Sequence, residues 1–173
     1  MKKQEIWTIG HSTHSLEEFF AMLNSFDIDL LIDIRRYPGS NRYPHFNKDE
    51  FKTSLAEDGF EYLHLESLGG RRKVQPDSQN TAWRLKSFQG YADYLETEEF
   101  KIAIEKLKTL AKNKKVAIMC AEAVWWSCHR SLIADYLKCD GWTVLHIMGI
   151  DKSTEHPYTK PAKIVNGKLD YSN

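Results

Sequence analysis

Residues 120–130 (CAEAVWWSCHR) combine two cysteines with a glutamate, a histidine and an arginine. A cysteine thiolate is both a nucleophile and a metal ligand, and a neighbouring arginine or helix N-terminus favours its charged form. Ser127 is a candidate N-cap, which would place Cys128 and the two residues after it in the first turn of a helix, where free N–H groups favour an anion. Glu122 is a candidate acid or base across the turn. The stretch therefore predicts a site for thiol chemistry on an anionic substrate.

Three interpretations of the cysteines stay open. In the first, Cys128 or Cys120 is a nucleophile, and Arg130 with helix N–H groups holds an anionic substrate. In the second, both cysteines bind a metal such as zinc, although the seven residues between them match no common zinc-knuckle spacing. The histidine of such a site would be His129, His11 or His146. In the third, both are small apolar core residues, the commonest state of a free cysteine.

A second group of candidates is basic and aromatic. Residues 35–48 (RRYPGSNRYPHFNK) carry three arginines and one lysine with no acidic residue. Residues 71–73 add another basic run after two glycines, which allow a backbone to approach a ligand closely. Arginine side chains suit phosphate, and aromatic faces suit bases. The candidates for substrate binding are Ser12, Arg35, Arg36, Arg42, Gly69, Gly70, Arg71, Arg130 and Trp126. The alternative is a solvated loop whose arginines pair with the chain's acids, which equal its basic residues in number.

Alternating strands and helices must position these groups. The strands are expected near residues 5–9, 28–34, 60–65, 116–119 and 143–148. Helices are expected from an N-cap at Ser15, from an N-cap at Asn47 to Gly59, over residues 97–112, and from Ser127 to about residue 138. Residues 164–169 (IVNGKL) predict a hairpin with an Asn-Gly turn. The fold class is therefore α/β: a mostly parallel β-sheet flanked by helices on both faces, a three-layer sandwich, with a C-terminal β-hairpin appendage.

This architecture predicts where the chemistry lies. In open α/β sheets, ligands bind outside the carboxyl ends of the strands. His11 and Ser12 follow the first strand, Asp33 and Arg35 the second, the Gly-Gly pair the third and Cys120 the fourth, and His146 comes with the fifth. We expect these loops to meet at one edge. The candidates for catalysis there are Cys120, Glu122, Cys128, His129, His11 and Asp33.

The composition limits the class of protein. A chain of 173 residues with a net formal charge of zero is expected to be one α/β domain over residues 1–173, with a core at 5–150 and the tail and hairpin at 151–173. Zero net charge argues against a strongly basic nucleic-acid coat. Three cysteines, no leader and no long apolar run lead us to expect a reduced, cytoplasmic protein without a membrane partner. The sequence names no cofactor and no oligomeric state.

Four motifs together resemble one known family. They are TIGHS at 8–12, IDIRRYPGSNRYPHFN at 32–47, LGGRR at 68–72, and CAE with CHR at 120–130. The chain resembles the bacterial and archaeal family called domain of unknown function 488 (DUF488), over about residues 6–150. The resemblance implies a cytosolic α/β protein with an enzyme-like or nucleic-acid-related role and no assigned reaction. The motif positions it carries over are His11, Ser12, Asp33, Arg35, Pro38, Gly69, Gly70, Cys120, Glu122, Cys128, His129 and Arg130.

The sequence thus predicts an enzyme that acts on a phosphate-bearing substrate, a nucleotide or a nucleic acid. Arginines 35, 42, 71 and 130 would hold the charge, and the catalytic candidates would supply the chemistry. Two alternatives stand beside this prediction. One is a non-catalytic nucleic-acid-binding module that uses the same basic edge, and the other is a metal or redox protein.

Overall fold

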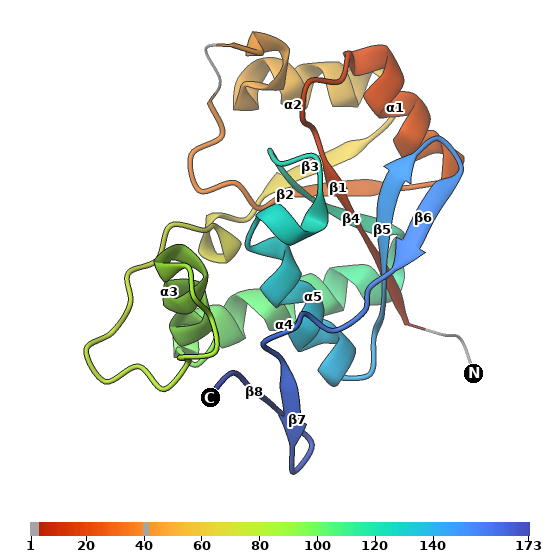
Figure 1. Ribbon diagram of the computed structural model, residues 1–173. Coiled ribbons are helices and arrows are strands. Elements are labelled where there is room, and N and C mark those ends of the chain that lie inside the picture. Colours follow the sequence, from red (N-terminus) through yellow and green to blue (C-terminus); the bar gives the residue numbers. More distant parts are fainter. Residues whose placement is uncertain (1–3, 40–41) are drawn as a thin grey trace.

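The computed structural model describes residues 4–39 and 42–173, so Ser40 and Asn41 of the predicted basic loop lie outside the described residues. A six-stranded sheet has the order β3-β2-β4-β1-β5-β6 (Figure 1). The first five of these strands run parallel, and β6 is antiparallel to β5. The strands are β1 (Glu5–Gly10), β2 (Leu30–Asp33), β3 (Glu61–His64), β4 (Val116–Cys120), β5 (Thr143–Gly149) and β6 (Lys152–Glu155).

Helices cover both faces of this sheet. Figure 1 shows α1 (Leu16–Ser25) and α2 (Lys48–Glu57) on one side. On the other side lie α3 (Lys86–Tyr94), α4 (Glu98–Asn113) and α5 (Arg130–Cys139). The predicted three-layer α/β architecture is confirmed. Among the described residues, no helix is both long and apolar enough to cross a membrane.

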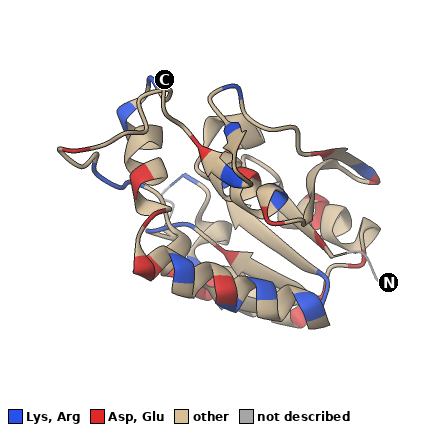
Figure 2. Ribbon diagram, turned by 90° about the horizontal axis from the view of Figure 1, so that it is seen from below, with Lys and Arg blue, Asp and Glu red and all other residues tan. Residues whose placement is uncertain are grey.

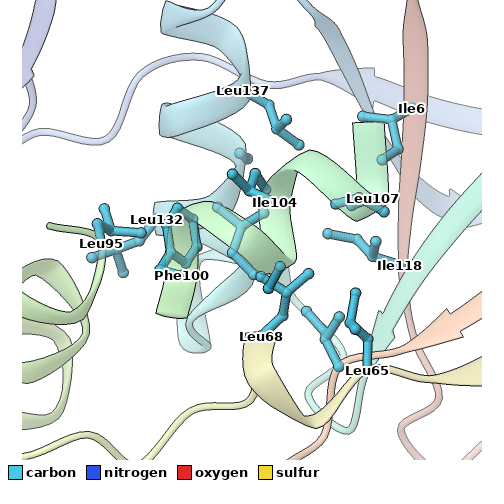
Figure 3. Close-up of a cluster of buried hydrophobic side chains, with 14 of the residues drawn as sticks. Ile6, Leu65, Leu68, Leu95, Phe100, Ile104, Leu107, Ile118, Leu132 and Leu137 are labelled. Carbon is cyan, nitrogen blue, oxygen red and sulfur yellow. The ribbon is translucent and has the colours of Figure 1, made fainter. Parts of the chain in front are cut away.

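Two hydrophobic cores fill the space between the layers. Alternate residues of the central strands point to opposite faces, so Ile6, Ile32 and Ile118 meet the α3–α5 layer. Figure 3 shows these strands packing against Phe100, Ile104 and Leu107 of α4 and against α5. Residues 7, 9, 31, 117 and 119 point instead into the α1–α2 layer. Burial on both faces explains why the first three residues of β2 are all apolar.

The helix starts agree with the sequence patterns only in part. The Ser15 hydroxyl accepts from the Glu18 backbone N–H at 3.1 Å, which confirms this N-cap. Asn47 is the N-cap residue of α2, but its side chain makes no capping hydrogen bond. The prediction that Ser127 caps a helix is wrong, because a 3₁₀ turn (Trp125–Ser127) and an extended Cys128 precede α5. Cys128 and His129 therefore lie before the helix rather than in its first turn.

Two elements, α3 and β6, were not predicted from the sequence, and the prediction of a C-terminal hairpin is confirmed. The short helix α3 contains Gly90, where an added Cβ would lie 2.0 Å from the Arg72 carbonyl oxygen, so close packing explains this glycine. Strand β6 is polar and exposed and follows a turn with Asp151 at φ 57°. The predicted hairpin forms as β7 (Lys163–Val165) and β8 (Lys168–Asp170), and its Asn166-Gly167 turn has both φ angles positive. It makes a separate two-stranded sheet.

Acidic and basic residues are distributed over the surface without segregation. Figure 2 shows lysine, arginine, aspartate and glutamate intermingled on the face seen from below. A local excess of one sign is therefore informative, and the carboxyl edge of the sheet has such an excess.

Candidate functional site

A cavity of about 700 Å³ opens at the carboxyl ends of β1, β2 and β4. Four parts of the described chain supply its lining residues, from 11–13, from 35–39 with 42–43, from 70–71, and from 120–123 with 127–129, and two residues at the start of α3 complete the wall. Of the predicted site residues, those in the lining are His11, Ser12, Arg35, Arg36, Arg42, Gly70, Arg71, Cys120, Glu122, Cys128 and His129. The predicted convergence of loops at this edge is thus present.

Four predicted site residues and His146 are placed elsewhere. Asp33 and Arg130 lie fully buried behind the lining. Gly69 packs below the surface, where an added Cβ would lie 2.8 Å from the Arg36 Cα. Trp126 is 56% exposed and lines a different cavity. His146 lies inside β5, with no exposed surface.

Ser87 and Phe88, which enter the lining from α3, were not predicted from the sequence. Their helix, which has only nine residues, was not predicted either. Thr13, Tyr37 and Tyr43 also line the cavity. Their position next to predicted site residues in the same loops could have identified them from the sequence.

The two cysteines of the lining form a pair. Cys120 ends β4, and its Sγ lies 2.8 Å from Cys128 Sγ, within hydrogen-bond distance. The backbone N–H of Arg130, the first residue of α5, donates to Cys128 Sγ at 3.4 Å. Cys120 and Cys128 expose only 3% and 7% of their surface, and both line the cavity.

The two thiols differ in acidity. Burial raises the pKa of each. For Cys120, the hydrogen bond from the Cys128 thiol and the positive charge of Arg130 outweigh burial, and its pKa is lowered. The pKa of Cys128 is raised well above the usual value, first by burial and then by its hydrogen bond to Cys120. Cys120 is therefore the more acidic member of the pair.

Close backbone packing fixes the position of Cys120. The N–H of His11 donates to the Cys120 carbonyl at 2.9 Å, and the N–H of Ser12 donates to the Ala121 carbonyl at 2.9 Å. Gly10 makes this approach feasible, because an added Cβ would lie only 1.7 Å from the Glu122 carbonyl oxygen. The end of β1 and the loop after β4 thus form one rigid wall of the cavity.

Arg35 is held by a buried carboxylate. Its Nε and Nη2 donate to the two Asp33 oxygens at 2.9 and 2.7 Å, and its backbone N–H donates to Oδ1 at 3.0 Å. The Tyr62 hydroxyl donates to Asp33 Oδ2 at 2.6 Å. Burial and then the Asp33 charge raise the pKa of Tyr62, so its hydroxyl stays a donor. Asp33 orients Arg35 from below the cavity.

His11 is neutral, and each of its ring nitrogens has a hydrogen-bond partner. Its Nδ1 donates to the Ser12 carbonyl at 3.0 Å, which leaves Nε2 as an acceptor 3.4 Å from Arg35 Nη1. Its ring stacks on Phe46, with the centroids 4.3 Å apart. Burial, opposed in part by the bond to Ser12, lowers the pKa of His11 to about 4.

His129 connects two walls of the cavity. Its Nε2 donates to the Ile34 carbonyl at 3.1 Å, just after β2. Gly70 lies against the other side of the ring, where an added Cβ would be 3.0 Å from Nδ1. Burial lowers the pKa of His129 to about 4, so the ring is neutral. These contacts make His129 a residue that positions the loops.

The rim of the cavity is basic. Among the described lining residues, the charged side chains are four arginines (35, 36, 42 and 71) and one acid, Glu122. Arg36 Nη1 donates to the Arg71 carbonyl at 2.8 Å. The Arg71 guanidinium lies 5.4 Å from the centroid of the Tyr37 ring. The carboxylate of Asp33 neutralises Arg35. The cations left for a ligand are therefore Arg36, Arg42 and Arg71.

Arg130 supports the loop that carries the thiols. Its Nη2 donates to the carbonyls of Glu122 and Ala123 at 3.1 and 3.2 Å, and its Nη1 donates to the Thr8 hydroxyl at 3.4 Å. Its Nε is buried without a hydrogen-bond partner in the described part of the chain. Only 1% of Arg130 is exposed, so its charge acts on Cys120 from inside the protein.

A chain of hydrogen bonds leads from Arg130 to a buried carboxylate. The Thr8 hydroxyl donates to His146 Nδ1 at 2.5 Å, and His146 Nε2 donates to His156 Nδ1 at 2.8 Å. His156 Nε2 donates to Asp135 Oδ1 at 2.8 Å. This order of donors follows from an ionised Asp135 at one end and Arg130 at the other. Burial, then the charges of His156 and Arg130, lower the pKa of His146 to about 2.

The carboxylate at the end of this chain also holds the C-terminal segment. Asp135 Oδ2 accepts from the hydroxyls of Thr159 and Tyr171 at 2.5 and 2.7 Å, and Oδ1 accepts from the Thr159 N–H at 3.0 Å. Trp125 stacks on His146, with the centroids 4.8 Å apart and the rings 6° from parallel. Trp125 is thus used inside the fold, while its neighbour Trp126 is exposed.

The described residues contain no group of three or more His, Cys, Asp or Glu side chains arranged to hold a metal ion. The predicted metal alternative required a histidine beside Cys120 and Cys128. The hydrogen bonds described above engage His129 with a carbonyl and His146 with Thr8 and His156.

Comparison with protein families gives one finding. The family model of the domain of unknown function DUF488 matches residues 15–137. This chain belongs to the DUF488 family. The matched region includes both cysteines, the Asp33–Arg35 pair, Arg130 and Asp135, and the family description indicates no function or substrate. No curated protein and no solved structure matches the chain.

Proposed function

We propose that this DUF488 protein is an enzyme that binds a phosphate-bearing substrate, a nucleotide or a nucleic-acid strand, and attacks it with the thiolate of Cys120. The observation that carries the proposal is the cysteine pair in the wall of a cavity whose other charged groups are nearly all arginines. An ionised thiol and a basic rim together suit an electrophilic substrate that carries negative charge.

The charges of the rim would bind the substrate. Arg36, Arg42 and Arg71 lie on two separate loops at the mouth of the cavity, so they approach a phosphate from more than one side. Glu122 is the single acidic side chain of the described lining. The excess of positive charge favours an anion and also raises the rate at which it is captured at low ionic strength.

The chemical step is a nucleophilic displacement. The Cys120 sulfur donates its electron pair to the electrophilic atom and forms a covalent bond. The bond to the leaving group breaks, and that group departs with its electron pair and takes a proton from water. Hydrolysis of the adduct restores the thiolate, and the proton of the attacking water goes to Glu122. Cys128 stabilises the thiolate by donating its S–H to it.

The test is alkylation by iodoacetamide as a function of pH, with each cysteine followed by mass spectrometry. Cys120 is expected to react at a lower pH than Cys139, because the pKa of Cys139 is raised by burial and by neighbouring acids. Inorganic pyrophosphate is expected to protect Cys120, and to protect it less in Arg71→Ala. Cys120 labelling that is no faster than that of Cys139 near neutral pH, or unaffected by pyrophosphate, refutes the proposal.

A second candidate function uses the same cavity without chemistry. The small exposed surface of both thiols favours it, because a buried cysteine is often only a core residue. A non-catalytic nucleic-acid-binding module would bind equally well as Cys120→Ser and would form no covalent adduct. Trapping of a substrate-derived adduct on Cys120 decides for the enzyme.

A further inference from the structure

Two more cavities extend from the main cavity. The second, of about 690 Å³, shares Phe88 with the main cavity. The third, of about 320 Å³, shares Trp83, Lys160 and Pro161 with the second. We call the second and third cavities together the aromatic groove. Because neighbouring cavities share side chains, the groove starts at the wall of the thiol-bearing cavity and runs away from it.

The charge of the aromatic groove has the same sign as that of the main cavity. Its charged lining side chains are Arg84, Lys160 and Lys163, and no acidic side chain lines it among the described residues. Arg84 and Lys160 are exposed and form no ion pair within the described part of the chain. Lys163 lies opposite Asp170 in the hairpin. In a chain with zero net charge, this local excess favours an anionic ligand.

Aromatic side chains line the groove together with these cations. Trp126 is 56% exposed, with its ring edge-on to Trp125, so a face of the indole is open to solvent. Trp83 is half-buried, and its Nε1–H is buried without a hydrogen-bond partner in the described part of the chain. An exposed indole ring in the same groove as a donor and cations that have no partner among the described residues fits a ligand that has both flat rings and oxygen acceptors.

We infer that the aromatic groove binds a single-stranded nucleic acid, with bases stacked on Trp126 and phosphates on Arg84 and Lys160, and leads that strand into the main cavity. This inference rests on the proposed function and names the class of its substrate. A free nucleotide would fill one cavity only, whereas cations and aromatic rings continue through the second and third. The bases of a duplex are already stacked on each other and cannot use an indole face.

The test measures the affinity of fluorescent oligonucleotides, in DNA and RNA forms, from a dinucleotide to a dodecamer. Affinity is expected to rise with length until the groove is filled and then to level off. A duplex of the same length is expected to bind more weakly than the single strand. The logarithm of the binding constant is expected to fall with the logarithm of salt concentration, with a slope of about −0.7 for each phosphate neutralised.

Surface variants locate the binding. Trp126→Ala is expected to weaken dodecamer binding about tenfold or more, and Trp126→Phe to restore most of the loss, because a ring face is what the base needs. Arg84→Ser and Lys160→Ser are each expected to reduce the salt slope by about 0.7. Lys106→Ser, on the exposed side of α4, is the matched control and is expected to change neither quantity.

The outcomes separate this inference from the proposed function. The inference about the aromatic groove is wrong if the affinity does not depend on oligonucleotide length, is equal for duplex and single strand, or is unchanged by Trp126→Ala. None of these results would contradict protection of Cys120 by pyrophosphate. Oligonucleotide binding that depends on Trp126 but leaves Cys120 unprotected in wild type supports the groove and overturns the enzymatic proposal. Binding of an acidic peptide with the same dependence on Trp126 would assign the groove to a protein partner and also overturn the inference.

Discussion

Replacement of Asp33 by asparagine tests how the cavity is built. The carboxylate is completely buried and accepts four hydrogen bonds, three from Arg35 and one from the Tyr62 hydroxyl. An asparagine has a single acceptor oxygen, so its NH₂ group must face at least one of these donors. It also leaves the Arg35 guanidinium, only 7% exposed, without its counter-charge. Removal of one partner from a buried ion pair costs about 3–5 kcal/mol.

This loss of folding stability is large enough to measure and small enough for the variant to remain folded. Domains have about 5–15 kcal/mol of stability, and 1 kcal/mol shifts the Tm by about 2–4 °C for a chain of this length. We therefore expect Asp33→Asn to lower the Tm by about 6–20 °C and to reduce pyrophosphate protection of Cys120, because Arg35 loses its orientation.

A double-mutant cycle with Arg35→Met, followed by urea unfolding, isolates the pair. The double variant is expected to lose clearly less stability than the sum of the two single variants, since it leaves no unpaired charge. Tyr62→Phe, which removes one donor and keeps the ion pair, is the milder control, at about 1.5–3 kcal/mol. An Asp33→Asn loss below about 1 kcal/mol, or strict additivity in the cycle, would refute a structural role for this pair.

Three further predictions follow from the buried groups. Folding lowers the pKa of His11 and of His129 from 6.5 to about 4. Between these pH values the two histidines bind protons in the unfolded chain but not in the folded protein. Urea unfolding at a series of pH values is expected to show stability present above pH 6.5 and lost as the pH falls toward 4, by about 1.4 kcal/mol per pH unit for each histidine; His11→Asn should reduce this slope. Gly10→Ala places a methyl group on the Glu122 carbonyl and is expected to lower both Tm and the reactivity of Cys120, whereas Gly39→Ala, with nothing within 4 Å, should change neither. Tyr171→Phe removes one donor from buried Asp135 and is expected to cost about 1.5–3 kcal/mol, compared with almost nothing for Tyr158→Phe at the surface; equal effects of the two would contradict an ionised Asp135.

The periodicity of apolar residues was sufficient to predict the layers of the fold. The apolar run of β2 and the helical spacing of α1 and α4 appear in the structure because burial on two faces or one stripe dictates them. Elements held by other forces were missed. Strand β6 is exposed and exists through its backbone pairing with β5, and α3 needs Gly90 to fit against the Arg72 carbonyl. Neither pairing nor close backbone contact leaves an apolar pattern.

The candidate site shows the same division. The parallel order of the strands brings His11, Arg35 and Cys120 to one edge, so topology alone predicted their proximity. Topology does not tell which side chains face the cavity and which lie below it. Asp33 and Arg130 ended below it, because a buried charge is stable only where hydrogen bonds surround it. The connection from Arg130 to Asp135 runs through three elements far apart in the chain, and no local spacing reveals it.

The two buried arginines explain why not every member of a cluster of positive charge must bind a ligand. Arg35 is neutralised directly by Asp33, and Arg130 is linked to Asp135 through Thr8, His146 and His156. The hydrogen bonds of these two arginines hold the backbone after β2 and after β4. This backbone forms the walls of the cavity and positions the Cys120 thiol. The charge of a ligand would then be met by the rim arginines, whose charges are screened by salt. Binding should therefore depend on ionic strength through Arg36, Arg42 and Arg71, while the acidity of Cys120, set by its hydrogen bond with Cys128 and by a buried guanidinium, should not.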